Sequence, residues 1–147
     1  MFINYTFAQS LTVSPGWSVT IPASTITEAG LNYTTNVTSS ASQSLMNVTG
    51  SIASNPKIYV QKTDVSWNTN LTLWLKRTGN GTGLLAFNIA GGTTFQQITN
   101  SPIYFFDLFT LSGTTVNNIP IQYEIRGLSV LIPAQSYTTT LLYTVTN

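Results

Sequence analysis

The chain has 147 residues, of which 42% are hydrophobic and only 6% are charged, and its formal net charge is +1. This composition excludes intrinsic disorder, which requires low hydrophobicity and high charge, and it disfavours nucleic-acid binding, because so few basic residues cannot form a basic surface. Cysteine and histidine are absent, which excludes thiolate chemistry and soft-metal sites. No run approaches the ~20 apolar residues of a membrane-spanning helix, so we expect no membrane insertion.

The first predicted element is an alternating strand over residues 2–13. It places one set of apolar side chains on a single face: Ile3, Tyr5, Phe7, Leu11 and Val13. Ser14-Pro15-Gly16 then breaks the strand and can act as a hinge. A free end of this kind suits β-strand addition to a neighbouring subunit. We therefore predict a donor strand and hinge over residues 1–15 and one domain over 16–147; the alternative is an ordinary first strand packed in its own domain.

The rest of the chain reads as short strands, because apolar residues alternate with polar ones and β-branched and aromatic residues dominate. No helical period persists for three turns. The predicted strands are 18–21, 47–53, 57–62, 71–75, 84–89, 93–98, 103–109, 119–125 and 137–145. Residues 34–44 are read as a polar edge strand or a loop, and Gly79-Asn80-Gly81 as a hairpin turn. This spacing predicts an all-β fold, an antiparallel β-sandwich or jelly-roll-like domain.

Six Asn-x-Ser/Thr acceptors for N-glycosylation occur along the chain. They are Asn4, Asn32, Asn36, Asn47, Asn70 and Asn80. Chance is one explanation in a chain so rich in Asn, Ser and Thr. The other is a glycan coat on an extracellular surface, which would supply hydration that charged residues do not. The first residues lack the basic and long apolar regions of a signal peptide, so we expect the mature form of a secreted protein.

Candidate catalytic groups are few, since the only carboxylates are Glu28, Asp64, Asp107 and Glu124. Lys62 stands two residues from Asp64 on one strand face, and Arg126 stands in the same relation to Glu124. We therefore predict surface ion pairs and no enzyme activity, although a calcium site through Asp64 or Asp107 is left open. No cofactor site is expected. Trp17, Trp67 and Trp74 are either core residues or a sugar-stacking platform.

The chain ends in a second alternating run that is preceded by Ile132-Pro133-Ala134 and begins Tyr137-Thr138-Thr139-Thr140. Together with the N-terminal strand, this ending resembles secreted filament subunits of the archaeal bundling-pilus type, and more weakly the spore-coat-protein-U-like archaic pilins. The latter carry a cysteine pair that this chain lacks. The resemblance implies a sandwich subunit that polymerises by donor-strand exchange and has no catalytic residues.

The sequence therefore predicts a structural subunit of an extracellular, cell-surface filament. Its partner would be a second copy of itself, arranged head-to-tail as an open polymer, with N-glycans as covalent additions. Two alternatives come from other classes of protein. One is a carbohydrate-binding or adhesive module, which needs a row of exposed aromatic side chains; the other is a jelly-roll capsid or surface-layer protein, which would form shells or lattices.

Overall fold

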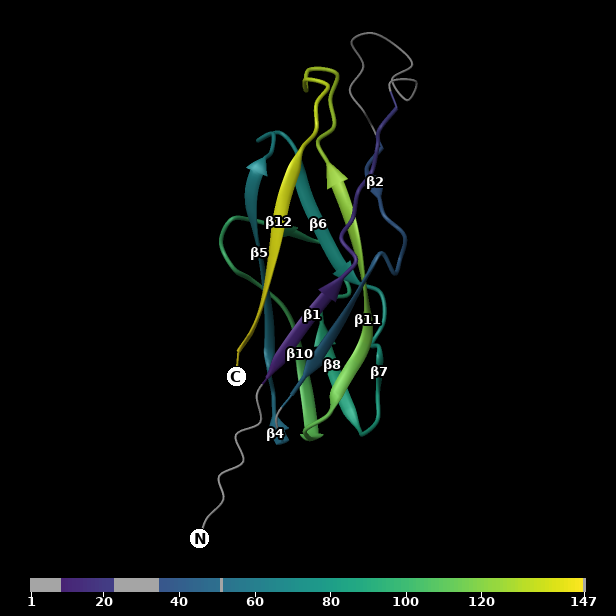
Figure 1. Ribbon diagram of the computed structural model, residues 1–147, viewed down its shortest axis with the longest axis vertical. Helices are drawn as coiled ribbons and strands as arrows, with labels where there is room; N and C mark the ends of the chain where they lie inside the picture. The colour runs from purple at the N-terminus through teal and green to yellow at the C-terminus, as the bar shows by residue number, and fades with distance from the viewer. Residues whose placement is uncertain (1–8, 23–34, 51, 147) are drawn as a thin grey trace.

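The computed structural model describes residues 9–22, 35–50 and 52–146, which form two layers of antiparallel strands (Figure 1). In the first sheet the order is β1 (Ser10–Ser14), β3 (Ser44–Thr49), β11 (Thr115–Arg126), β6 (Thr72–Arg77) and β9 (Gln96–Ile98), and β2 (Val37–Thr38) and β7 (Thr82–Gly83) also pair with β11. In the second it is β12 (Thr138–Thr146), β5 (Lys57–Ser66), β10 (Ile103–Ser112) and β4 (Ile52–Ser54), and β8 (Phe87–Gly91) also pairs with β10. The predicted all-β antiparallel sandwich is confirmed.

The core lies between the two sheets, because side chains alternate between interior and surface along the strands. The first sheet contributes Met46, Val48, Leu73, Leu75, Ile98, Val116, Ile119, Ile121 and Tyr123 to it, and the second contributes Ile58, Val60, Ile89, Phe105, Phe106 and Leu108. Phe105 and Phe106 are both buried although they are adjacent. A register shift between Tyr104 and Phe106 inserts one extra residue in β10 and turns both rings inward.

The predicted strand over residues 47–53 is wrong, because the chain changes sheets within it. β3 belongs to the first sheet and β4 to the second, and Gly50 lies between them. A Cβ atom on Gly50 would lie 2.7 Å from the Thr110 Oγ1 atom, so a larger residue here would displace the buried Thr110 side chain. Its N–H donates to the Thr114 carbonyl at 3.2 Å.

Two other local predictions are wrong as well. Residues 78–81 form no hairpin turn, because β6 and β7 both pair with β11, through Ile121↔Arg77 and Asn117↔Thr82. The chain keeps its direction along β11, and residues 78–81 are an insertion between the two paired segments. Residues 18–21 form no strand. In residues 34–44, predicted as an edge strand or loop, the described part is loop except for β2 and for Ser44, which begins β3.

The long axis of the sandwich runs along β11, which gives the molecule two distinct ends (Figure 1). We call the end at which β10 turns into β11, around residues 112–115, the hairpin end. The opposite end holds residues 127–137, which connect β11 to β12, and we call it the loop end. β1 begins near the hairpin end, since Ser10 pairs with Thr49 and Thr49 with Thr115.

Candidate assembly site

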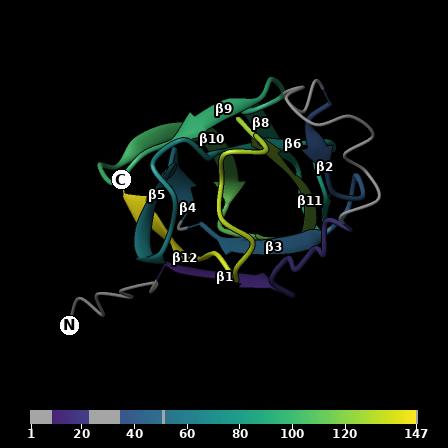
Figure 2. The ribbon, with the colours of Figure 1, turned by 90° about the horizontal axis from the view of Figure 1, so that it is seen from above.

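β1 lies at one edge of the first sheet, beside β12 of the second (Figure 2). It pairs with β3 from Ser10↔Thr49 to Ser14↔Leu45, and Leu11 and Val13 are partly buried against the core. In the single chain, residues 10–14 therefore form an ordinary first strand, and exchange of Leu11 and Val13 between subunits stays a prediction. Ile3, Tyr5 and Phe7 lie outside the described residues.

The predicted hinge at residues 14–16 does end β1, but the chain after it is held to the domain. The Ser44 hydroxyl donates to the Pro15 carbonyl at 2.5 Å, and the Gln43 amide donates to the Gly16 carbonyl at 3.3 Å. The Trp17 ring then stacks on Tyr123, with ring centroids 6.0 Å apart. These contacts fix the path of residues 15–17, so a swing of the N-terminal segment from this hinge would have to break them.

A chain of hydroxyl groups connects this anchor to β12. The Tyr123 hydroxyl donates to Ser44 Oγ at 2.9 Å, and the Tyr143 hydroxyl lies 3.2 Å from that of Tyr123. Because Ser44 and Tyr123 each use their single proton elsewhere, Tyr143 is the donor to Tyr123. Burial, and then the neighbouring Tyr123, raise the pKa of Tyr143 well above its usual value. Sequence reasoning missed this network, although two tyrosines at inward positions require polar partners.

β12 presents the longest free edge that touches this region. Among the described residues its backbone pairs only with β5, from Thr138↔Ser66 to Thr146↔Lys57. Its 9 residues, TTTLLYTVT, include no charged residue and no proline. Natural proteins usually protect such an edge with charge, proline or a covering segment, because unpaired N–H and C=O groups invite pairing with another chain. The outer edge of β12 is therefore a candidate site for strand addition.

Two of the described carboxylates, Asp64 and Glu124, form the predicted local ion pairs, whereas Asp107 forms none and its Oδ1 atom is buried without a hydrogen-bond partner. Lys62 Nζ lies 2.5 Å from Asp64 Oδ2, and Arg126 Nε lies 2.5 Å from Glu124 Oε1. Partial burial alone would raise the pKa of Asp64, but hydrogen bonds from Lys62 and Thr139 outweigh it and the pKa is lowered. Across residues 9–22, 35–50 and 52–146, no three acidic side chains gather as metal ligands. Glu28 lies outside this part of the chain.

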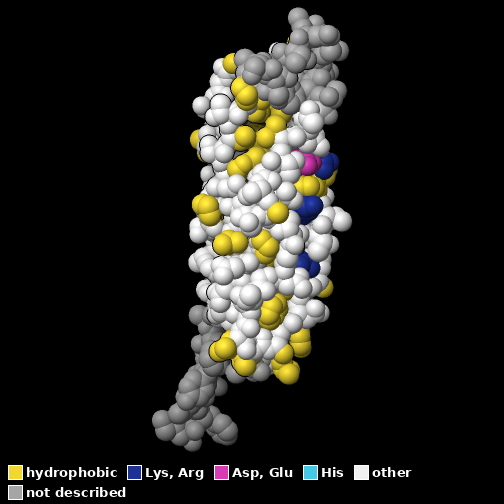
Figure 3. Space-filling model, turned by 90° about the vertical axis from the view of Figure 1, so that its right-hand side faces the viewer, with side chains coloured by type: hydrophobic (Ala, Val, Ile, Leu, Met, Phe, Trp, Pro, Cys, Tyr) yellow, Lys and Arg dark blue, Asp and Glu magenta, His cyan; other side chains and the backbone are white. Residues whose placement is uncertain are grey.

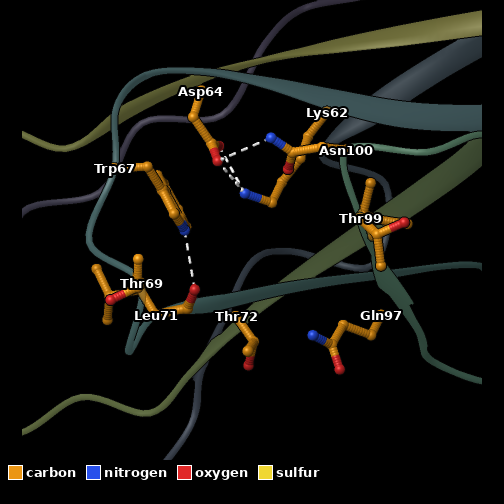
Figure 4. Close-up of a pocket in the computed structure, with 10 residues that line it drawn as sticks. Lys62, Asp64, Trp67, Thr69, Leu71, Thr72, Gln97, Thr99 and Asn100 are labelled. Atoms are coloured by element: carbon orange, nitrogen blue, oxygen red, sulfur yellow. Dashed lines mark hydrogen bonds and ion pairs between the residues drawn. The ribbon is translucent and has the colours of Figure 1, made fainter.

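The three tryptophans do not share one surface. Trp17 and Trp67 pack against the core, whereas Trp74 lies on the outer face of β6, 3.9 Å beneath the Arg126 guanidinium. Trp67 lies at a hollow of about 290 Å³, which Lys62, Asp64, Gln97 and Asn100 help to line. Figure 4 shows these side chains around it. The polar groups here mostly bind one another, because Asp64 accepts from Lys62 and Asn100 and the Trp67 N–H donates to the Leu71 carbonyl. A row of exposed aromatics is thus not formed by these three residues.

The sequons differ in how free their side-chain amides are. Asn36 Nδ2 donates to Glu124 at 3.2 Å, Asn47 Nδ2 donates to Thr12 at 3.4 Å, and Asn80 Oδ1 accepts from Arg77 at 2.5 Å. Asn70 is exposed in the turn before β6, and no described contact engages its side-chain amide. Asn4 and Asn32 lie outside the described residues.

We expect Asn70 to be the most fully glycosylated of the four described sequons when the chain is secreted from a glycosylating host. Its Nδ2 atom is free to accept a sugar, whereas those of Asn36 and Asn47 already donate hydrogen bonds. Glycopeptide mass spectrometry measures the occupancy of each site, and Asn70→Gln should remove the largest single glycan mass. Asn47→Gln is the matched control. Occupied Asn47 together with unoccupied Asn70 would contradict this ranking.

Comparison with known proteins finds no matching family model, no similar curated protein and no similar solved structure. In the part of the chain that the structure describes, no helix is long and apolar enough to cross a membrane.

Proposed function

We propose that this protein is a structural subunit of an extracellular filament. Each copy would join the next head-to-tail, with its N-terminal strand paired to a sheet of the neighbouring copy. The observation that carries the proposal is the free edge of β12, which is uncharged over 9 residues and lies beside the short strand β1. A long, uncharged edge of this kind favours main-chain pairing between chains.

The surface chemistry supports the same function. Only 6% of residues are charged, and two of the described carboxylates, Asp64 and Glu124, are engaged in ion pairs, which suits a structural role. The sequence of residues 3–8 alternates apolar and polar or small side chains and, like β12, contains no charge and no proline. Two uncharged strands can pair without burying an unpaired charge, which would be costly.

Deletion of residues 1–8 tests the proposal. The deletion ends before β1, because Leu11 and Val13 pack in their own domain and their loss would damage the fold. We expect a folded monomer with an unchanged unfolding temperature and no filaments in negative-stain electron micrographs, whereas the full chain forms them.

A matched pair of full-length variants separates side-chain chemistry from chain length. The first variant combines Ile3→Ser, Tyr5→Ser and Phe7→Ser; it removes the apolar face and should abolish filaments. The second combines Asn4→Ser, Thr6→Ser and Ala8→Ser; it changes only the other face and should leave filaments intact. Filaments that persist after the deletion overturn the proposed joint. A full chain that stays monomeric overturns the function itself.

A further inference from the structure

The hairpin end of the sandwich carries large apolar side chains that contact little else. Leu84 is 93% exposed and Leu111 is 61% exposed, and Leu85 is exposed beside them. The strand pairs bring them together: Gly83 lies opposite Val116 and Phe87 opposite Thr110, so residues 84 and 85 turn next to the β10–β11 hairpin. Figure 3 shows hydrophobic side chains at this end, with the charged side chains higher on the same face.

The loop end carries a second apolar group. Leu131 is 85% exposed in the connection between β11 and β12, and Val65 is 71% exposed near the end of β5. Val65 is the extra residue of a bulge, since β12 pairs with Ser66 and then with Asp64. A bulge of this kind aims one side chain away from the regular ladder.

Neither end brings an unpaired charge against these groups. Residues 78–91, 108–119 and 127–138 contain no Lys, Arg, Asp or Glu, and the charges beside the loop end form two ion pairs, Lys62–Asp64 and Arg126–Glu124. Single exposed apolar residues are common on proteins, but two groups at opposite ends of one elongated domain have a geometric consequence. Contact between unlike ends repeats from copy to copy, and it gives an open filament when the rotation between copies does not close a ring.

We propose that the hairpin end of one copy packs on the loop end of the next copy, with the Leu84–Leu85–Leu111 group against the Val65–Leu131 group. This inference rests on the proposed function and names its second contact. The chain itself indicates that the partner at the hairpin end is a second copy. Gln9 and Ser10 lie at this end, so the residues before them join the domain there. A copy that receives that N-terminal segment must lie beyond the hairpin end.

Cysteine cross-linking tests this contact without background, because the natural chain has no cysteine. Leu84→Cys and Leu131→Cys variants are mixed in equal amounts, assembled and treated with a short bis-maleimide. We expect a covalent 84–131 dimer, identified by peptide mass spectrometry, at least about tenfold more abundant than any dimer from either variant alone. Leu142→Cys replaces Leu131→Cys in the control mixture, because Leu142 is also exposed but lies midway along β12; no dimer with Leu84 is expected there.

A second measurement uses Leu84→Glu, which should leave the unfolding temperature unchanged because the side chain is exposed. It should raise the protein concentration needed for assembly about tenfold, which corresponds to ~1.4 kcal/mol. An 84–84 dimer as the main product, or filaments that yield no 84–131 dimer, overturns the end-to-end contact while the filament function stands. An 84–131 dimer that survives deletion of residues 1–8 upholds the contact and overturns the strand joint.

Discussion

Replacement of Arg77 by methionine should destabilise the domain by about 3–5 kcal/mol. Arg77 is only 5% exposed, and its guanidinium donates hydrogen bonds to four oxygen atoms. It donates to the carbonyls of Gly91 at 2.5 Å, Gly79 at 3.3 Å and Ile89 at 3.3 Å, and to Asn80 Oδ1 at 2.5 Å.

The cost arises because methionine fills similar space but leaves these oxygens without a donor. The bond to the Ile89 carbonyl is buried, and a buried acceptor that loses its partner costs about 1–3 kcal/mol. The three part-buried bonds, to Gly91, Gly79 and Asn80, add smaller amounts. The bonds also join β6 to β8, across the two sheets, so their loss weakens a tertiary connection. Burial lowers the pKa of the Arg77 guanidinium, which is the expected sign for a cation withdrawn from water.

Thermal unfolding followed by circular dichroism measures the effect, and a drop of roughly 6–15 °C is expected for a domain of this size. Lys76→Met is the matched control: it removes the same charge from the adjacent residue, whose side chain points outward over the Phe95 ring at 4.6 Å. That change should shift the midpoint by no more than about 2 °C. Equal shifts for the two variants would contradict the role assigned to Arg77.

The position of Arg77 shows what alternation could and could not predict. The alternation over residues 71–75 predicts Leu71, Leu73 and Leu75 on one face of a strand, and all three are buried. The predicted strand ends at residue 75, whereas β6 extends to Arg77 and places this cation on the same buried face. Its partners could not be foreseen, because they come from β8 and from the insertion between β6 and β7, whose geometry depends on how β11 pairs with both.

Local relations were predictable where two residues share one strand. The Lys62–Asp64 and Glu124–Arg126 pairs follow from a separation of two along a pleated strand, and both are formed. The hydroxyl chain from Tyr143 to Pro15 was not predictable, since it joins four segments distant in sequence. The same applies to the sheet change at Gly50, which depends on the close approach of Thr110.

For the N-terminal strand, the sequence predicts the apolar face but not the domain against which that face packs. Alternation placed Leu11 and Val13 on an apolar face, and that face does contact the core. Alternation carries no information about whose core receives the strand, because a neighbouring copy offers the same groove. The anchor at Pro15, Gly16 and Trp17 is what ties residues 10–14 to their own domain in the single chain.

A last prediction concerns Gly127, at the end of β11, where alanine should cost about 3 kcal/mol or more. Its φ of +85° is a left-handed conformation that other residues adopt only with strain. In addition, an added Cβ atom would clash with the Asn70 carbonyl oxygen.

Relief of that overlap requires the turn that carries Asn70 to move away from β11. Gly127→Ala should therefore lower both the unfolding temperature, by roughly 6–12 °C, and the protection of the Leu71 amide, which donates to the Asn68 carbonyl at 3.0 Å. Gly16→Ala is the control, because no atom lies within 4 Å of its added Cβ. Hydrogen exchange and thermal unfolding measure the two effects, and a Gly127→Ala protein as stable as Gly16→Ala would show that the turn yields freely. In that case the turn at the loop end would be more mobile than its packing indicates. A contact between copies would then have to order this turn, and the entropy lost would lower the affinity of that contact.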